Sequence, residues 1–94
     1  SPPEDTLTVN MQITGKVQGV GFRYFVFRQA QELGIKGWVS NTSNGNVEAL
    51  AHGEKADLEQ FIPKVKEGPS LSRVDDVNLN WVNEAEQYFG FEII

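Results

Sequence analysis

The sequence contains no cysteine and only one histidine, His52. The absence of cysteine excludes disulfide scaffolds, thiol catalysis, iron–sulfur clusters and cysteine-based zinc sites, and it suggests a reducing compartment, so we expect a cytoplasmic protein. A single histidine rules out a histidine-rich metal centre, and we expect neither a metal ion nor a cofactor. The sequence also lacks a run of about 18 apolar residues and an apolar segment after a basic N-terminus, so we expect no membrane partner and no signal peptide.

Basic residues are scarce as well. The chain has 8 Lys and Arg against 13 Asp and Glu, which gives a net charge of −5 at pH 7. A chain that is acidic overall is a poor candidate for nonspecific nucleic-acid binding, so we expect no nucleic-acid partner. The charge is unevenly distributed, because residues 6–47 carry +3 and residues 48–94 carry −6. The unusual glycines lie in the locally basic part.

The length of the chain limits its domain organisation. Ninety-four residues, of which 39% are hydrophobic, suffice for one modest core and therefore for one domain. We assign residues 6–94 to that domain and residues 1–5, which read Ser-Pro-Pro-Glu-Asp, to a loose N-terminal tail. A monomer is the default expectation for a domain of this size.

The spacing of apolar residues predicts the secondary structure. Alternation predicts strands over 7–14, 35–41, 46–53, 77–81 and 89–93, and helical stripes predict helices over 22–33 and 56–66. Gly34 is placed to end the first helix, Asn44-Gly45 to form a hairpin, and residues 84–87 to form a turn. Pro63 lies inside the second helix, where we expect a kink or a late N-terminal turn rather than a perfect helix.

The order of these elements is βαββαβ with a short final strand. With right-handed crossovers, this order predicts a ferredoxin-like sandwich, an α+β fold in which an antiparallel sheet carries two helices on one face. Six aromatic residues match the periodicity of core positions, and we expect them to pack rather than to stack on nucleobases. These residues are Phe22, Phe25, Trp38, Phe61, Trp81 and Phe91.

The segment between the first strand and the first helix contains Gly15, Gly19 and Gly21. Glycines permit positive φ, so successive backbone N–H groups can point into one concavity, and the start of the helix adds its positive dipole end. Arg23 falls in the first turn of that helix, beside Lys16, although cations are disfavoured there. The spacing is neither a Walker A motif nor a dinucleotide-binding motif. The residues alone leave two possibilities open: an anion-binding nest, or a glycine-rich turn with a solvated arginine.

Two motifs resemble the signatures of one enzyme family. Residues 15–23, Gly-Lys-Val-Gln-Gly-Val-Gly-Phe-Arg, closely resemble the first signature of the acylphosphatase family. Residues 37–41, Gly-Trp-Val-Ser-Asn, together with Gly45, Val47 and Gly53, resemble the second. The resemblance extends from about Thr8 to the end of the sequence.

The resemblance implies metal-independent hydrolysis of the carboxyl–phosphate anhydride of small acyl phosphates. It implies that Arg23 binds the phosphoryl oxygens and that Asn41 positions the attacking water. Inorganic phosphate and sulfate are tetrahedral anions that fit a nest of backbone N–H groups at a helix start, so we expect them as ligands of the same site. The resemblance also implies that backbone N–H groups cradle the phosphoryl group along the loop of Lys16, Val17, Gln18, Gly19, Val20 and Gly21. The composition suits this chemistry, because a carboxylate with a conjugate-acid pKa of about 4 leaves without a general acid.

Other interpretations remain open at the level of sequence. Asn41 precedes a turn and could serve only to form it, and His52 is more simply a strand residue than a base. The same element order hosts RNA-recognition domains, whose Lys/Arg-Gly-aromatic motif is echoed by residues 36–39, although on the second strand rather than the third. The chain could also be a phosphate-binding domain of a larger protein, as acylphosphatase-like domains of maturation proteins are.

Overall fold

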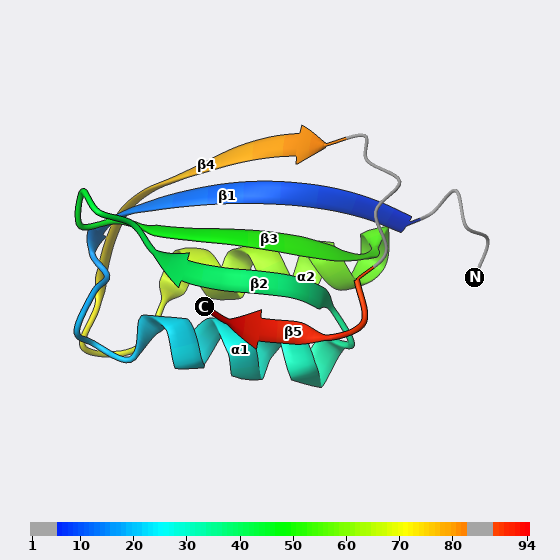
Figure 1. Cartoon of the computed structure of the whole chain (residues 1–94), viewed down its shortest axis with the longest axis horizontal. Helices are drawn as coiled ribbons and strands as arrows, with labels where there is room; N and C mark the ends of the chain where they lie inside the picture. The colour runs from blue at the N-terminus through cyan, green and yellow to red at the C-terminus, as the bar shows by residue number, and fades with distance from the viewer. Residues whose placement is uncertain (1–5, 83–87) are drawn as a thin grey trace.

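The computed structural model describes residues 6–82 and 88–94, so the expected tail over 1–5 and turn over 84–87 lie outside the described residues. Two α-helices lie against one face of a sheet (Figure 1). In chain order the elements are β1 (Thr6–Lys16), α1 (Phe22–Leu33), β2 (Lys36–Asn41), β3 (Val47–Glu54), α2 (Lys55–Glu67), β4 (Arg73–Val82) and β5 (Phe91–Ile93).

The sheet has the strand order β4-β1-β3-β2-β5. The pairs β1–β3, β1–β4 and β2–β3 are antiparallel, which confirms the ferredoxin-like sandwich. The expectation of a fully antiparallel sheet is wrong for β5, which pairs with β2 in parallel. Both β2 and β5 run opposite to β4. Because β5 lies beside β2 at the far edge of the sheet from β4, the two neighbours run in the same direction.

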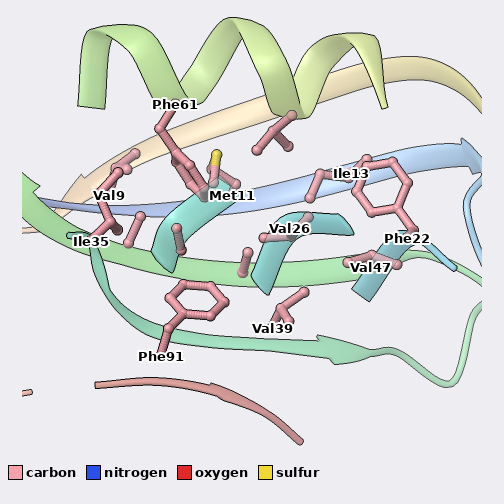
Figure 2. Close-up of a cluster of buried hydrophobic side chains, with 14 of the residues drawn as sticks. Val9, Met11, Ile13, Phe22, Val26, Ile35, Val39, Val47, Phe61 and Phe91 are labelled. Atoms are coloured by element: carbon pink, nitrogen blue, oxygen red, sulfur yellow. The ribbon is translucent and has the colours of Figure 1, made fainter. Parts of the chain in front are cut away.

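The core fills the space between the sheet and the helices (Figure 2). Its side chains come from alternate positions of the strands and from one stripe of each helix, as the periodicity predicts. Removing a large apolar side chain of this kind from water contributes about 1.5–3 kcal/mol. The fully buried large residues are Val9, Met11, Ile13, Val17, Phe22, Val26, Val39, Val47, Leu58, Phe61 and Val65.

Only some of the aromatic residues that were expected in the core are buried there. Phe22, Phe61 and Phe91 are buried. Trp81 is 51% exposed, so its expected place in the core is wrong. It shares a face with Val9, with which it pairs across β1–β4, but it lies on an edge strand where fewer neighbours cover it. Trp38 is only half-buried, because it alternates with the buried Val39 and therefore lies on the sheet face away from the helices.

That open face of the sheet is largely polar. The Thr8 hydroxyl lies 2.7 Å from His52 Nδ1, and Asn10 Nδ2 donates to a Glu48 carboxylate oxygen at 3.0 Å. His52 is thus a strand residue with a polar partner, as expected. In the β2–β3 ladder His52 pairs with Lys36, whereas Asn41 pairs with Val47, so His52 lies at the opposite end of that ladder from Asn41.

The helices and strands begin and end close to where the sequence predicts, with differences at Pro63 and at the start of β4. Gly34 ends α1 in the left-handed conformation at φ 69°, and the next amide, that of Ile35, donates to Ala30 at 2.8 Å, which confirms the predicted stop. The helix α2 continues through Pro63, which is exposed, so the carbonyl deprived of its partner can face water. The strand β4 begins at Arg73 rather than at residue 77, because an edge strand tolerates a charged start that breaks the alternating pattern.

Candidate active site

The loop between β1 and α1 depends on a glycine before it begins. Gly15 adopts φ 126°, and a Cβ at this position would overlap the main-chain oxygen of Arg73 on β4. The register of β1 against β4 shifts between Thr14 and Gly15, as in a β-bulge. The residue skipped by the register is Asp75, so the bulge lies on β4, and Gly15 lets β1 pass close to Arg73 just before the chain crosses to α1.

The loop itself presents a continuous run of backbone donors. Gly19 and Gly21 have φ values of 74° and 77°, which other residues rarely adopt. The first bond of α1 is donated by the Phe25 amide to the Gly21 carbonyl at 3.0 Å, and Gly21 supplies no side-chain cap. Within the described part of the chain, the N–H groups of residues 18–24 have no hydrogen-bond acceptor. Runs of free N–H groups that end on a helix N-terminus favour anions in proteins, and the first turn of α1 holds no acid that would oppose one.

The side chain of Gln18 ties this loop to the β2–β3 hairpin. Its Nε2 donates to the Thr42 carbonyl at 2.8 Å and to the Asn46 carbonyl at 2.7 Å. The same two residues close the hairpin, since the Thr42 amide donates to the Asn46 carbonyl at 2.9 Å. The loop and the last residue of β2, Asn41, are therefore held at a fixed separation.

A pocket of about 210 Å³ opens where these segments meet. In Figure 1 they converge at the left end of the sheet, where β2 ends, β5 ends and α1 begins. The residues that line the pocket are Val17, Gly19, Gly21, Phe22, Arg23, Tyr24, Asn41 and Ile93.

The structure therefore brings together residues from both sequence motifs. Arg23 and Asn41 line the same pocket, although they lie on different elements. Of the loop residues expected to form the cradle, Lys16, Gln18 and Val20 do not line the pocket. Lys16 is the exposed last residue of β1, and Gln18 points its amide to the hairpin. Their expected contribution was through backbone N–H groups, and for residues 18–21 those groups are free within the described chain.

The polar side chains of the pocket differ in their anchoring. Arg23 Nη1 donates to the main-chain oxygen of Ile94 at 3.2 Å, so the guanidinium is directed from α1 toward the end of β5. Asn41 is exposed at the end of β2, and its amide has no hydrogen-bond partner among the described residues. Its mounting is rigid nevertheless, because the ladder pairs Asn41 with Val47 directly before the hairpin.

Three residues that line the pocket were not predicted as site residues: Phe22, which was expected only to pack in the core, Tyr24 and Ile93. Tyr24 follows Arg23 in the first turn of α1, and its position beside a candidate arginine was the only available signal. Ile93 enters the pocket because β5 pairs in parallel with β2, where it aligns with Val39. No local pattern in the sequence indicates that pairing.

The described residues contain neither a metal-binding cluster nor a membrane-spanning helix. Residues 6–82 and 88–94 contain no group of three or more His, Cys, Asp or Glu side chains that could hold a metal ion. Neither helix in these ranges is long and apolar enough to cross a membrane.

Comparisons with known proteins agree on one family. The family model for acylphosphatase matches residues 9–93. An acylphosphatase from Lactobacillus gasseri is 48% identical over 88 residues, which cover 93% of this chain and 97% of that protein. The crystal structure of acylphosphatase from Bacillus subtilis matches with a TM-score of 0.91 and 39% identity, over 94% of this chain and 98% of that one.

A larger protein contains a similar unit. The crystal structure of full-length HypF in its phosphate- and nucleotide-bound form matches with a TM-score of 0.86 and 42% identity, over 95% of this chain but 12% of that one. The family model and the relatives together cover nearly the whole sequence, including both motifs at the pocket. The chain therefore belongs to the acylphosphatase family, whose members hydrolyse the carboxyl–phosphate anhydride of acyl phosphates.

Proposed function

We propose that this acylphosphatase hydrolyses its substrate in the pocket between the 15–21 loop, the end of β2 and the end of β5. The observation that carries the proposal is the run of N–H groups at residues 18–24, which lack acceptors within the described chain and lead into a pocket lined by Arg23 and Asn41. A phosphoryl group supplies the oxygen acceptors that these donors lack.

The loop and Arg23 hold the phosphoryl group. The backbone N–H groups of the loop and the first turn of α1 donate to its oxygens, and the helix dipole favours its negative charge. The planar guanidinium of Arg23 donates to two phosphoryl oxygens at once and stabilises the charge that develops during transfer. Because Arg23 Nη1 is already bound to the Ile94 oxygen, the side chain is held near the pocket before substrate arrives.

Asn41 positions the water. Its amide offers both a donor and an acceptor, so it can orient a water molecule toward phosphorus from the end of β2. The water oxygen forms the new bond to phosphorus, the bond from phosphorus to the acyl oxygen breaks, and the carboxylate leaves with the electron pair. The water's proton passes to solvent. Since the carboxylate is a good leaving group, orientation and charge stabilisation suffice, and neither a general acid nor a metal ion takes part.

The remaining parts of the proposal concern the protein as a whole. Residues 6–94 form one domain that works as a monomer in the cytoplasm on small acyl phosphates. The open face of the sheet does not favour the RNA-binding alternative, because its central strands carry the hydrogen-bonded pairs Thr8–His52 and Asn10–Glu48 where an RNA-recognition domain presents aromatic rings.

The test is phosphate release from benzoyl phosphate, measured with and without EDTA and with increasing inorganic phosphate or sulfate. We expect turnover that EDTA leaves unchanged and that both anions inhibit competitively. Loss of turnover in EDTA with recovery in Mg²⁺ would contradict the metal-independent mechanism. Noncompetitive inhibition would contradict the location of the phosphoryl site.

A further inference from the structure

The pocket has an apolar wall that the hydrolysis of the anhydride does not itself require. Val17 and Phe22, which also line it, are buried at 1% exposure and belong to the core. The accessible apolar surface is instead that of Tyr24, 59% exposed, and Ile93, 42% exposed. These two residues come from different elements, α1 and β5, and line the same pocket as Arg23 and Asn41. Exposed apolar side chains that gather at a pocket mark a place for an apolar ligand group.

Tyr24 is held in place by a row of aromatic rings that begins in the core. Phe61 and Phe91 have ring centroids 6.4 Å apart, Phe91 and Phe27 are 6.5 Å apart, and Phe27 and Tyr24 are 6.2 Å apart. All three separations lie in the range favoured by aromatic pairs. The Tyr24 and Phe27 rings are stacked with an inclination of 27°, so the tyrosine ring extends the row of aromatic rings to the pocket.

Ile93 is fixed by the parallel pairing of β5. It aligns with Val39 on β2, and the next amide, that of Ile94, donates to the Val39 carbonyl at 2.9 Å. Val39 lies two positions before Asn41 on the same strand, so the side chain of Ile93 is placed at the end of the sheet where Asn41 orients water. Both parts of the wall are therefore preorganised.

The size of the pocket leaves room for more than the phosphoryl group. Its volume of about 210 Å³ corresponds to roughly seven water molecules at about 30 Å³ each. A phosphoryl group seated on the N–H groups of the loop occupies only part of this space. Tyr24 and Ile93 line the same pocket and can border the space that the phosphoryl group leaves.

We propose that Tyr24 and Ile93 form the acyl-group subsite, so that this enzyme selects acyl phosphates whose acyl group is aromatic or branched and apolar over acetyl and other small or polar ones. The proposal rests on the proposed location of the phosphoryl site. The ring of Tyr24 packs against the acyl group and Ile93 covers it from the other side. This contact excludes water from the apolar part of the acyl group. It also orients the anhydride between Arg23 and Asn41.

The test compares benzoyl phosphate with acetyl phosphate. The measured quantity is the ratio of the two kcat/KM values in each variant, divided by the ratio in the wild type, so that the intrinsic difference between the leaving groups cancels. Tyr24→Ala lowers this ratio by about three- to tenfold, the usual scale of one aromatic contact. Tyr24→Phe keeps the ratio, because the ring and not the hydroxyl makes the contact. Ile93→Thr, which retains β-branching but is smaller and polar, lowers the ratio in the same direction as Tyr24→Ala.

The control is Phe89→Ala, which removes an aromatic side chain that is 89% exposed and does not line this pocket. It keeps the wild-type ratio. A ratio unchanged by Tyr24→Ala overturns the proposal, as does an equal loss in Tyr24→Phe, which would assign the role to the hydroxyl. The inhibition constant of inorganic phosphate, which has no acyl group, distinguishes an error in the acyl subsite from an error in the phosphoryl site. If phosphate competes normally while the ratio is unchanged, only the acyl subsite is wrong; if phosphate does not compete in the wild type, the phosphoryl site itself is wrong.

Discussion

Replacing Gln18 with glutamate exchanges the side-chain NH₂ group for an oxygen at the point where the loop meets the hairpin. The Gln18 amide donates to the Thr42 and Asn46 carbonyls at 2.8 and 2.7 Å. In Gln18→Glu at neutral pH, a carboxylate with no hydrogen to donate faces the same two oxygens. Both hydrogen bonds are lost, at about 1 kcal/mol each, and repulsion between the oxygens raises the expected loss of stability to about 2–4 kcal/mol.

The same substitution makes the loss of stability depend on pH. Two carbonyl oxygens facing the introduced carboxyl group favour its neutral acid form, so its pKa in the folded state is raised above the unfolded value of about 4.3. Below the unfolded pKa the protonated acid donates one hydrogen bond, and part of the stability is recovered. The stability then falls as pH rises toward and through the folded pKa. The difference from the wild type should therefore be smaller at pH 4 than at pH 7.

The Gln18→Glu variant should also lose activity, because the loss of these hydrogen bonds releases the loop from the hairpin. The hydrogen bonds of Gln18 fix the loop against the strand that carries Asn41, and a misplacement of about 1 Å between catalytic groups can lower the rate by about 10²-fold. Urea unfolding between pH 4 and pH 8 and kcat/KM for benzoyl phosphate measure both effects. Gln60→Glu, the same change at an exposed position of α2, is the control and should shift stability by no more than about 0.5 kcal/mol. If the two variants match at pH 7, the reasoning about Gln18 is refuted.

Three further substitutions test other parts of the structure. Asn41→Ala should lower kcat for benzoyl phosphate by about 10²-fold or more while calorimetry shows an unchanged affinity for inorganic phosphate; retained turnover would reduce Asn41 to a turn former. Arg23→Lys should lower kcat/KM by about 10²-fold because lysine lacks the planar fork, whereas Arg28→Lys on the same helix should not, and a fully active Arg23→Lys enzyme would show that charge alone suffices. Gly37→Ala should lower the free energy of unfolding by about 2–4 kcal/mol, because its φ is 138° and a Cβ would overlap the Leu50 carbonyl. Gly45→Ala, where φ is 90° but no atom lies within 4 Å, isolates the backbone strain alone; equal losses in the two variants would show that the overlap does not matter.

The parts of the fold that sequence reasoning predicted are those governed by local periodicity. The helix α1 was predicted with the bounds Phe22–Leu33 that the structure gives it, because its apolar stripe and Gly34 act within a few residues. The start of β4 was missed, because Arg73, Asp75 and Asp76 interrupt the alternation that one buried face produces. The direction of β5 depends on which edge it meets, and no local signal encodes that choice.

The same distinction applies to the pocket. The loop glycines and Arg23 lie within nine consecutive residues, so a motif could indicate them together. The role of the Gln18 side chain was not predicted, because its partners lie 24 and 28 residues further along the chain. Ile93 likewise requires knowledge of the parallel pairing of β5.

That pairing has a consequence for the order in which the protein folds and loosens. The hydrogen bond from Arg23 to Ile94 joins residues 71 positions apart, and β5 is a strand of three residues at the edge of the sheet. Contacts between distant residues form after local ones, and short edge segments open at a lower free energy than the whole domain. We therefore expect a state in which the loop and α1 are in place while β5 is detached, so that Ile93 and the anchor of Arg23 are lost but the N–H groups of the loop remain. We expect activity to be lost in that state, before the domain unfolds as a whole.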